Sequence, residues 1–301
     1  MKTSVSFRII DAVLIVMMIL PLVFGIVLHV LTAPATEGVS ITGARVFFTV
    51  PMPLQDFPVT ESQVHSVLVT LLILFLSLYL THGVTEHAGL RRQLVAEWCV
   101  EKVDGLVMEN MGEYFAGFSP FVISILALSA FSSLLSLFGL YAPTSDINVV
   151  GGWSVLVFLL ITYYKMKCGV FHYMKSLTEP VPVLTPFNII SEFATPVSMA
   201  FRHYGNVLSG AVVSTLIGTA LAGLSSRILS ALPATLRQIP ILRFGLPAVF
   251  SVYFDIFSSL LQAFIFAMLT MLYVSGGFPA EDYAKKQARK RLKHKKSSAK
   301  V

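Results

Sequence analysis

TPVSMAFRHYGNVLSG, residues 195–210, decides the fold, because it places an arginine inside a long apolar segment that continues as AVVSTLIGTALAGL. Arg202 lies near the middle of this segment. Arginine keeps its proton at physiological pH, so it cannot enter lipid as a neutral group. A charge at the centre of a membrane helix costs roughly 2.5–3.5 kcal/mol on insertion scales and normally faces a partner or a water-filled cavity. Arg202 is therefore the first candidate functional residue.

Polar residues accompany Arg202 at helical spacing. Intervals of three and four residues place one stripe on a helix that is otherwise apolar, made of Glu192, Thr195, Ser198, Arg202, Asn206 and Ser209. Such a stripe is one wall of a hydrophilic path, or a seam against a polar helix. The alternative is that Arg202 lies near a helix end and extends its guanidinium into water. Pro196 favours this alternative if it marks the start of the helix.

The composition indicates a membrane protein. Of the 301 residues, 55% are hydrophobic and only 13% are charged, against about 25% charged in soluble domains. Several apolar runs are long enough to cross a hydrocarbon core of ~30 Å. Cys99 and Cys168 have no metal-binding spacing. No cofactor fingerprint is present, so the sequence predicts neither a cofactor nor a metal site.

Six apolar segments predict an all-α polytopic fold with about six membrane helices, at residues 9–31, 64–82, 114–140, 151–173, 187–224 and 247–274. The last two form a long tilted hairpin. Residues 83–113 predict either an amphipathic helix on the cytoplasmic membrane face or a solvated connecting helix with no further role. Residues 9–31 are either a signal peptide, with the weak cleavage site TAPA, or a retained helix. Their length of 23 residues favours the helix, because the apolar core of a signal peptide usually has 7–15 residues.

Charge sets the expected orientation. Lys2 and Arg8 precede the first apolar segment, and the tail contains KKQARKRLKHKKSSAK. Positive charge favours the cytoplasmic side, so both ends are expected inside, which six crossings allow. Residues 33–63 are expected to form an external surface segment. The basic tail is expected to be solvated and attracted to anionic lipid, without binding nucleic acid.

The last apolar segment carries a second polar stripe. It consists of Asp255, Ser258, Ser259 and Gln262, and Gln262 follows Asp255 by seven residues, on the same helical face. The final two membrane helices therefore present one cationic and one anionic polar face. The alternative is a structural seam in which these groups satisfy each other and conduct nothing.

These stretches resemble subunit a of F-type ATP synthases. PVSMAFRHYGNVLSG (196–210) resembles the arginine motif of that family, and LLQAFIFAMLTMLYVS (260–275) resembles its last-helix signature. PTSDINV (143–149) resembles an external-loop motif, and PFNIISE (186–192) also fits. The resemblance covers roughly residues 64–277. It implies three parts, namely an extra N-terminal helix and external loop (1–63), a subunit-a-like membrane domain (64–277) and a basic cytoplasmic tail (278–301).

The resemblance implies a non-catalytic stator subunit in the cell membrane. Such a subunit adjoins a rotating ring of c subunits and the peripheral-stalk b subunits, while ATP forms on other chains of the complex. Two offset aqueous half-channels lead to a ring carboxylate, which Arg202 faces. Other matched positions are Asn206 and Gln262 at the arginine site, Glu192 near the cytoplasmic half-channel, Asp146 and Asn148 near the outer one, and Asp255 as an outer relay.

The sequence departs from the family pattern in three places. His203 and Tyr204 replace the usual Leu-Phe, and Ala211 stands where many members have Glu or His. The outer relay is therefore expected to depend largely on Asp255. The alternatives to a rotary stator are a secondary ion transporter with a charged midplane site and a structural membrane scaffold. The coupling ion, H⁺ or Na⁺, is left open by the sequence.

Overall fold

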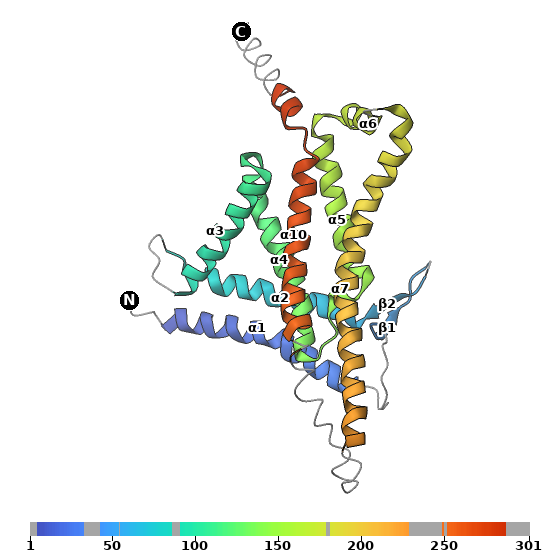
Figure 1. The fold of residues 1–301 in the computed structure, drawn as a ribbon. Coiled ribbons are helices and arrows are strands. Elements are labelled where there is room, and N and C mark those ends of the chain that lie inside the picture. Colours follow the sequence, from blue (N-terminus) through green and yellow to red (C-terminus); the bar gives the residue numbers. More distant parts are fainter. Residues whose placement is uncertain are drawn as a thin grey trace.

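Two N-terminal helices lie side by side, connected through a short strand pair (Figure 1). Helix α1 spans Val5–Leu31 and α2 spans Glu61–Thr81. Strands β1 (Val46–Val50) and β2 (Phe57–Thr60) pair antiparallel between them. In this computed structural model the described residues are 5–32, 43–53, 55–85, 91–178, 181–228, 249 and 252–286. The expected helix 64–82 begins three residues early, because Thr60 N–H donates to Gln63 Oε1 (3.2 Å), as in a capping box.

Helix α3 spans Arg91–Met111, so a helix forms where residues 83–113 predicted one. Its apolar side chains divide between two surroundings. Val103, Val107 and Met111 are buried in the main core, whereas Leu94, Val95 and Trp98 are more than half exposed. One end of α3 therefore packs into the bundle, and the other end presents apolar side chains outward.

Four further helices form the main bundle. A 3-10 turn (Glu113–Phe118) leads into α4 (Ser119–Leu134), and a second turn, Pro143–Ser145, leads into α5 (Ile147–Lys165). Short α6 (Val170–Thr178) precedes α7 (Thr185–Ile228). A π-helical turn, Val252–Ser258, continues into α10 (Ser259–Gly276).

Helix α7 corrects one expectation. It passes through Pro196 without ending and begins at Thr185, seventeen residues before Arg202. The hypothesis that Pro196 starts a helix and places Arg202 near its end is therefore wrong. The 44 residues of α7 correspond to about 66 Å of helix. The predicted turn beyond residue 228 lies outside the described residues.

The helices form two groups that lie crosswise in Figure 1. Helices α4, α5, α7 and α10 run roughly alongside one another, with α7 packed on α5 and α10 packed on α4. Helices α1 and α2 run across them, and α2 makes the contact with α4. The core between α4, α5, α7 and α10 contains a cluster of apolar side chains that includes Val122, Val157, Met199, Phe266 and Met271. Buried polar side chains lie on the same helices, among them His203 and Gln262.

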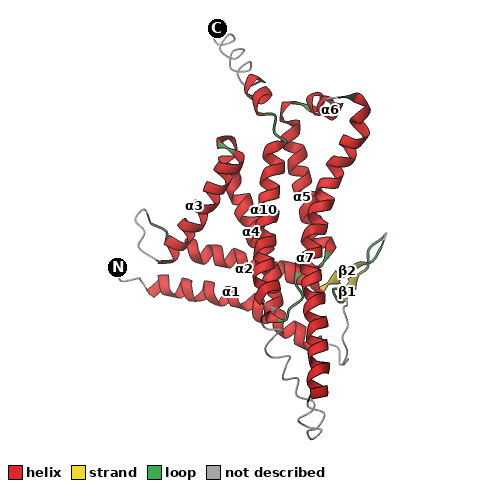
Figure 2. Cartoon of the chain, in the orientation of Figure 1, coloured by secondary structure: helices red, strands yellow, loops and turns green. Residues whose placement is uncertain are grey.

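Six helices of the described residues are long and apolar enough to cross a membrane. Helix dominates the chain, as Figure 2 shows, and the described strands are limited to the β1–β2 pair. The prediction of an all-α polytopic membrane protein is confirmed.

The start of the basic tail is ordered against the bundle. Residues 280–286 are helical, and Lys286 Nζ donates to the carbonyls of Lys167 (3.1 Å) and Cys168 (3.0 Å). The Tyr283 ring lies 5.4 Å from that of Tyr114. This part of the tail is therefore ordered by apolar and hydrogen-bonding contacts, while Glu281, Asp282 and Lys285 remain exposed, as the expectation of a solvated tail requires. Residues 287–301 lie outside the described part of the chain.

Candidate functional site

Helix α7 has a buried face and an exposed face at the level of Arg202. Met199, Ala200, His203 and Gly210 point into the bundle. The exposed face carries the middle of the predicted stripe, Ser198, Arg202, Asn206 and Ser209, beside the apolar side chains Val197 and Phe201. Arg202 has no ion pair or side-chain hydrogen bond with any residue that the structure describes. Arg202 therefore lies on an exposed face of α7 that carries both polar and apolar side chains.

Asn206 and Gln262 connect α7 to α10. Asn206 Nδ2 donates to Gln262 Oε1 at 2.8 Å. Gln262 is 1% exposed, and its own Nε2 has no partner among the described residues. The two amides therefore satisfy each other across the contact of α7 with α10, whereas Arg202 and Asp255 do not pair with each other.

A cleft of about 210 Å³ surrounds Glu192; we call it the Glu192 cleft. Its lining comes from α5, α7 and the end of α10, and includes Lys165, Glu192, Thr195 and Tyr273. Lys165 Nζ donates to Glu192 Oε1. The sequence analysis missed this ion pair, because the two residues are 27 positions apart on different helices. Burial and the nearby Glu192 carboxylate raise the pKa of Tyr173 on α6.

A second cleft, of about 240 Å³, surrounds Asp255; we call it the Asp255 cleft. Tyr141 and Ser145 line it from the α4–α5 connection, Val207 and Gly210 from α7, and Asp255 from the π-helical turn. Such turns are rare and often occur at functional sites. The turn packs closely on α7, because a Cβ added at Gly210 would lie 3.2 Å from the Phe254 ring.

Asp146 and Asn148 lie at the N-terminus of α5. Asp146 Oδ1 accepts hydrogen bonds from Asn148 N (2.9 Å) and Asn148 Nδ2 (3.1 Å). Ser62 Oγ of α2 donates to the other oxygen, Asp146 Oδ2. Asp146 is therefore the N-cap of α5, and its bond with Ser62 ties α2 to the start of α5, directly after Ser145 of the Asp255 cleft. The structure places Asp146 and Asn148 together, next to Ser145 of the Asp255 cleft, whereas Glu192 lines the other cleft.

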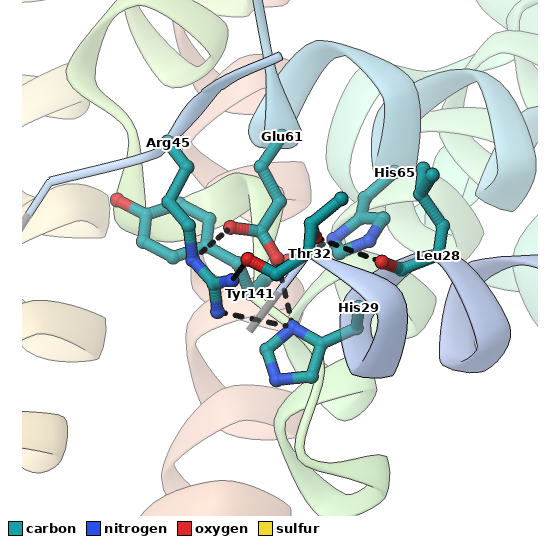
Figure 3. Close-up of polar contacts among 7 residues, drawn as sticks. All are labelled: Leu28, His29, Thr32, Arg45, Glu61, His65 and Tyr141. Atoms are coloured by element: carbon teal, nitrogen blue, oxygen red, sulfur yellow. Dashed lines mark hydrogen bonds and ion pairs between the residues drawn. The ribbon is translucent and has the colours of Figure 1, made fainter. Parts of the chain in front are cut away.

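Figure 3 shows a buried ionic cluster that the sequence analysis did not predict. Glu61 is 1% exposed. Its carboxylate lies 2.9 Å from His29 Nδ1 and 3.4 Å from Arg45 Nε. His65 Nδ1 lies 2.8 Å from the carbonyl oxygen of Tyr141. The cluster joins α1, the segment before β1, α2 and the lining of the Asp255 cleft. The sequence did contain one signal of this cluster, because His29 is a polar residue within the first apolar segment.

Tyr141 lies between this cluster and the Asp255 cleft. Its hydroxyl donates to the Ser145 carbonyl at 3.1 Å. Burial, with the negative charges of Asp146 and Glu61 close by, raises its pKa to about 12. Tyr141 therefore keeps its proton at physiological pH and remains a hydrogen-bond donor.

The fold and the site define a polytopic membrane protein with polar and charged groups set between its helices. A family model described as ATP synthase A chain matches residues 63–275. The chain belongs to this family, so it is a membrane subunit of the ATP synthase complex with a part in ATP synthesis and ion transport. The resemblance noted from the motifs is confirmed.

Curated relatives agree with the family. The chain is 27% identical over 274 residues to "ATP synthase subunit a, sodium ion specific" of Propionigenium modestum, a match that covers 81% of this chain and 88% of the relative. It is 30% identical over 226 residues to ATP synthase subunit a of Bacillus pumilus. This match covers 71% of this chain and 90% of the relative. The subunit a of Priestia megaterium is 34% identical over 191 residues, covering 60% and 75%.

Proposed function

We propose that this chain is the proton-translocating stator subunit of a rotary F-type ATP synthase, with Arg202 facing the rotor. The observation that carries this proposal is the position of Arg202 on the uncovered face of α7, between two clefts. Thr195 lines one cleft and Val207 lines the other, twelve residues or about 18 Å apart along the helix. Arg202 lies between these two positions.

The Glu192 cleft serves as the cytoplasmic half-channel and the Asp255 cleft as the outer one. A carboxylate on the c-subunit ring receives a proton from one cleft and releases it to the other after rotation. The fixed charge of Arg202 stabilises the ionised carboxylate, because a nearby cation favours the charged form of an acid. It also opposes direct passage of cations between the clefts. Each proton that crosses supplies ~2.3 kcal/mol per 100 mV.

The remaining site residues take positions in this path. Asn206 and Gln262 hold α7 and α10 together beside Arg202, and Glu192 exchanges protons at the cytoplasmic cleft. Asp255 is the outer relay, and Asp146 and Asn148 lie at its mouth. In this proposal the chain resides in the cell membrane with its C-terminus in the cytoplasm. It contacts the c ring and the peripheral-stalk b subunits, and it carries out no ATP chemistry itself.

ATP-driven pumping in inverted membrane vesicles tests the proposal, with Arg202→Ala as the variant and Arg91→Ala as the matched control. Arg91 is an exposed arginine on α3, away from both clefts. We expect Arg202→Ala to abolish pumping while the c ring still co-purifies, and Arg91→Ala to pump normally. Wild-type pumping by Arg202→Ala would refute the assigned role. Omitting Na⁺ identifies the coupling ion, since pumping that requires Na⁺ contradicts proton coupling.

A further inference from the structure

One face of the β1–β2 hairpin is apolar and largely exposed. Phe48 pairs with Val59, and Val50 pairs with Phe57, across the two strands. Directly paired residues, and residues two positions apart on one strand, lie on the same face of a sheet. Phe48, Val50 and Phe57 are 58%, 37% and 44% exposed, and Val59 is half-buried. We call these four residues the apolar hairpin face.

The charged residues of this region lie away from the apolar hairpin face. Arg45, directly before β1, directs its guanidinium to the buried Glu61 carboxylate. Asp56 is exposed and directly precedes β2. On the opposite face of the hairpin, Thr49 pairs with Pro58, and both are exposed. The hairpin is therefore an amphipathic ribbon with an uncharged apolar side.

The hairpin is fixed where two candidate membrane helices end. Strand β2 runs directly into α2, and Glu61 N–H donates to the Arg45 carbonyl at 2.8 Å. Arg45 Nη1 donates to the carbonyl of Thr32, the residue after α1, at 3.0 Å. In Figure 1 the hairpin lies beyond the end of α2. Because α1 and α2 are each long and apolar enough to cross a membrane, their joined ends mark a membrane surface.

The position and chemistry of the apolar hairpin face favour lipid over water or protein. A two-stranded hairpin is only marginally stable in water, so an apolar face left in water gives it no support. Amphipathic elements at a membrane surface bury their apolar side at the boundary between headgroups and acyl chains. Protein–protein contacts depend mainly on Trp, Tyr and Arg, and this face carries only Phe and Val.

We propose that the β1–β2 hairpin is a membrane anchor, whose apolar face rests on the bilayer and inserts Phe48, Val50 and Phe57 among lipid acyl chains. Thr49 then faces the headgroups and water. The hairpin recognises the apolar chains of the lipid rather than a headgroup charge, because its inserted face has no charge. Through Arg45 it holds the joined ends of α1 and α2 at a fixed depth. Only the choice of leaflet, the outer one, rests on the proposed function.

Spin-label accessibility in the intact complex, reconstituted into phosphatidylcholine vesicles, tests the anchor. In a background with Cys99 and Cys168 changed to serine, a nitroxide is attached to Phe48→Cys and, as the matched control, to Thr49→Cys. These neighbours are both exposed and lie on opposite faces of the hairpin. Molecular oxygen concentrates in lipid, whereas a neutral nickel chelate stays in water. We expect the ratio of oxygen to nickel accessibility to be several-fold higher at 48 than at 49.

Each other outcome overturns the anchor. Equal ratios at 48 and 49 would place the apolar hairpin face in water, and low accessibility to both reagents at 48 would place it against protein. Val50→Cys is the second site on the same face, in case the label at 48 disturbs the contact, and it should also favour oxygen. Adding phosphatidylglycerol should leave the ratio at 48 unchanged, and a strong rise would show that headgroup charge is recognised instead. No measurement involves pumping, so failure of the anchor leaves the role of Arg202 unaffected.

Discussion

Replacing Arg45 by methionine tests whether charge holds the buried end of α2 in place. The Glu61 side chain is 2% exposed, and its two oxygens lie 3.4 Å from Arg45 Nε and 2.9 Å from His29 Nδ1. Removing one partner of a fully buried ion pair costs about 3–5 kcal/mol, because it leaves an unpaired charge. Arg45 is 31% exposed and His29 still contacts Glu61, so solvent screening reduces the expected loss to about 2 kcal/mol.

A double-mutant cycle separates this charge effect from simple loss of packing. We expect Glu61→Gln to cost about 1–2 kcal/mol, and the Arg45→Met/Glu61→Gln double variant to cost about 1 kcal/mol less than the sum, because contacting groups are not additive. The assay is reversible unfolding in mixed detergent followed by far-ultraviolet circular dichroism. Arg91→Met, at an exposed arginine, is the control and should change stability little. Additivity within about 0.3 kcal/mol would refute the coupling.

Three further predictions concern single contacts. Asp146→Ala should lose about 1 kcal/mol of stability with the N-cap of α5, and Asp146→Asn should lose less because it keeps an acceptor; thermal unfolding distinguishes them. Gly83→Ala should destabilise by about 1 kcal/mol or more, because φ is +77° and the new Cβ would lie 2.4 Å from the Phe7 ring; the unfolding midpoint measures this. Lys165→Met should destabilise the chain more than Lys165→Met/Glu192→Gln does, because only the single variant leaves the half-buried carboxylate unpaired; equal losses would contradict the ion pair.

Hydropathy and spacing predicted the elements well and their ends less well. The six apolar segments correspond to the six candidate spans, because each segment is long and apolar enough to cross a membrane as a helix. The start of α2 was missed because Glu61 and Ser62 look like loop residues. Their buried contacts with Arg45 and Asp146 exist only in the folded chain.

The continuation of α7 through Pro196 also could not be predicted from the local sequence. Proline removes one backbone donor, which is tolerated in membrane helices where neighbouring groups compensate. The Thr195 hydroxyl, next to Pro196, bonds to the Ser191 carbonyl at 3.0 Å. Packing of α7 against α5 then favours a continuous helix over a new start at the proline.

The sequence suggested candidate site residues but not how they are arranged. Sequence spacing placed Asp255 and Gln262 on one face, assuming a regular α-helix. The π-helical turn changes the angle per residue, so Gln262 is 1% exposed in the interior while Asp255 is half-buried and lines a cleft. Pairings such as Lys165–Glu192 depend on which helices become neighbours, and the sequence of one chain does not contain that information directly.

The length of α7 links the fold to the proposed mechanism. A helix of about 66 Å is more than twice as long as the ~30 Å hydrocarbon core, so it either extends beyond the core or tilts. The proposed mechanism requires the tilted arrangement. Helices α1 and α2 lie across α7 (Figure 1), which allows them to stand upright while α7 and the helices alongside it lie inclined. The ~18 Å between the two clefts along α7 then becomes mainly a sideways offset rather than a difference in depth. A carboxylate at one fixed depth on a turning ring would meet first one cleft and then the other, passing Arg202 between them.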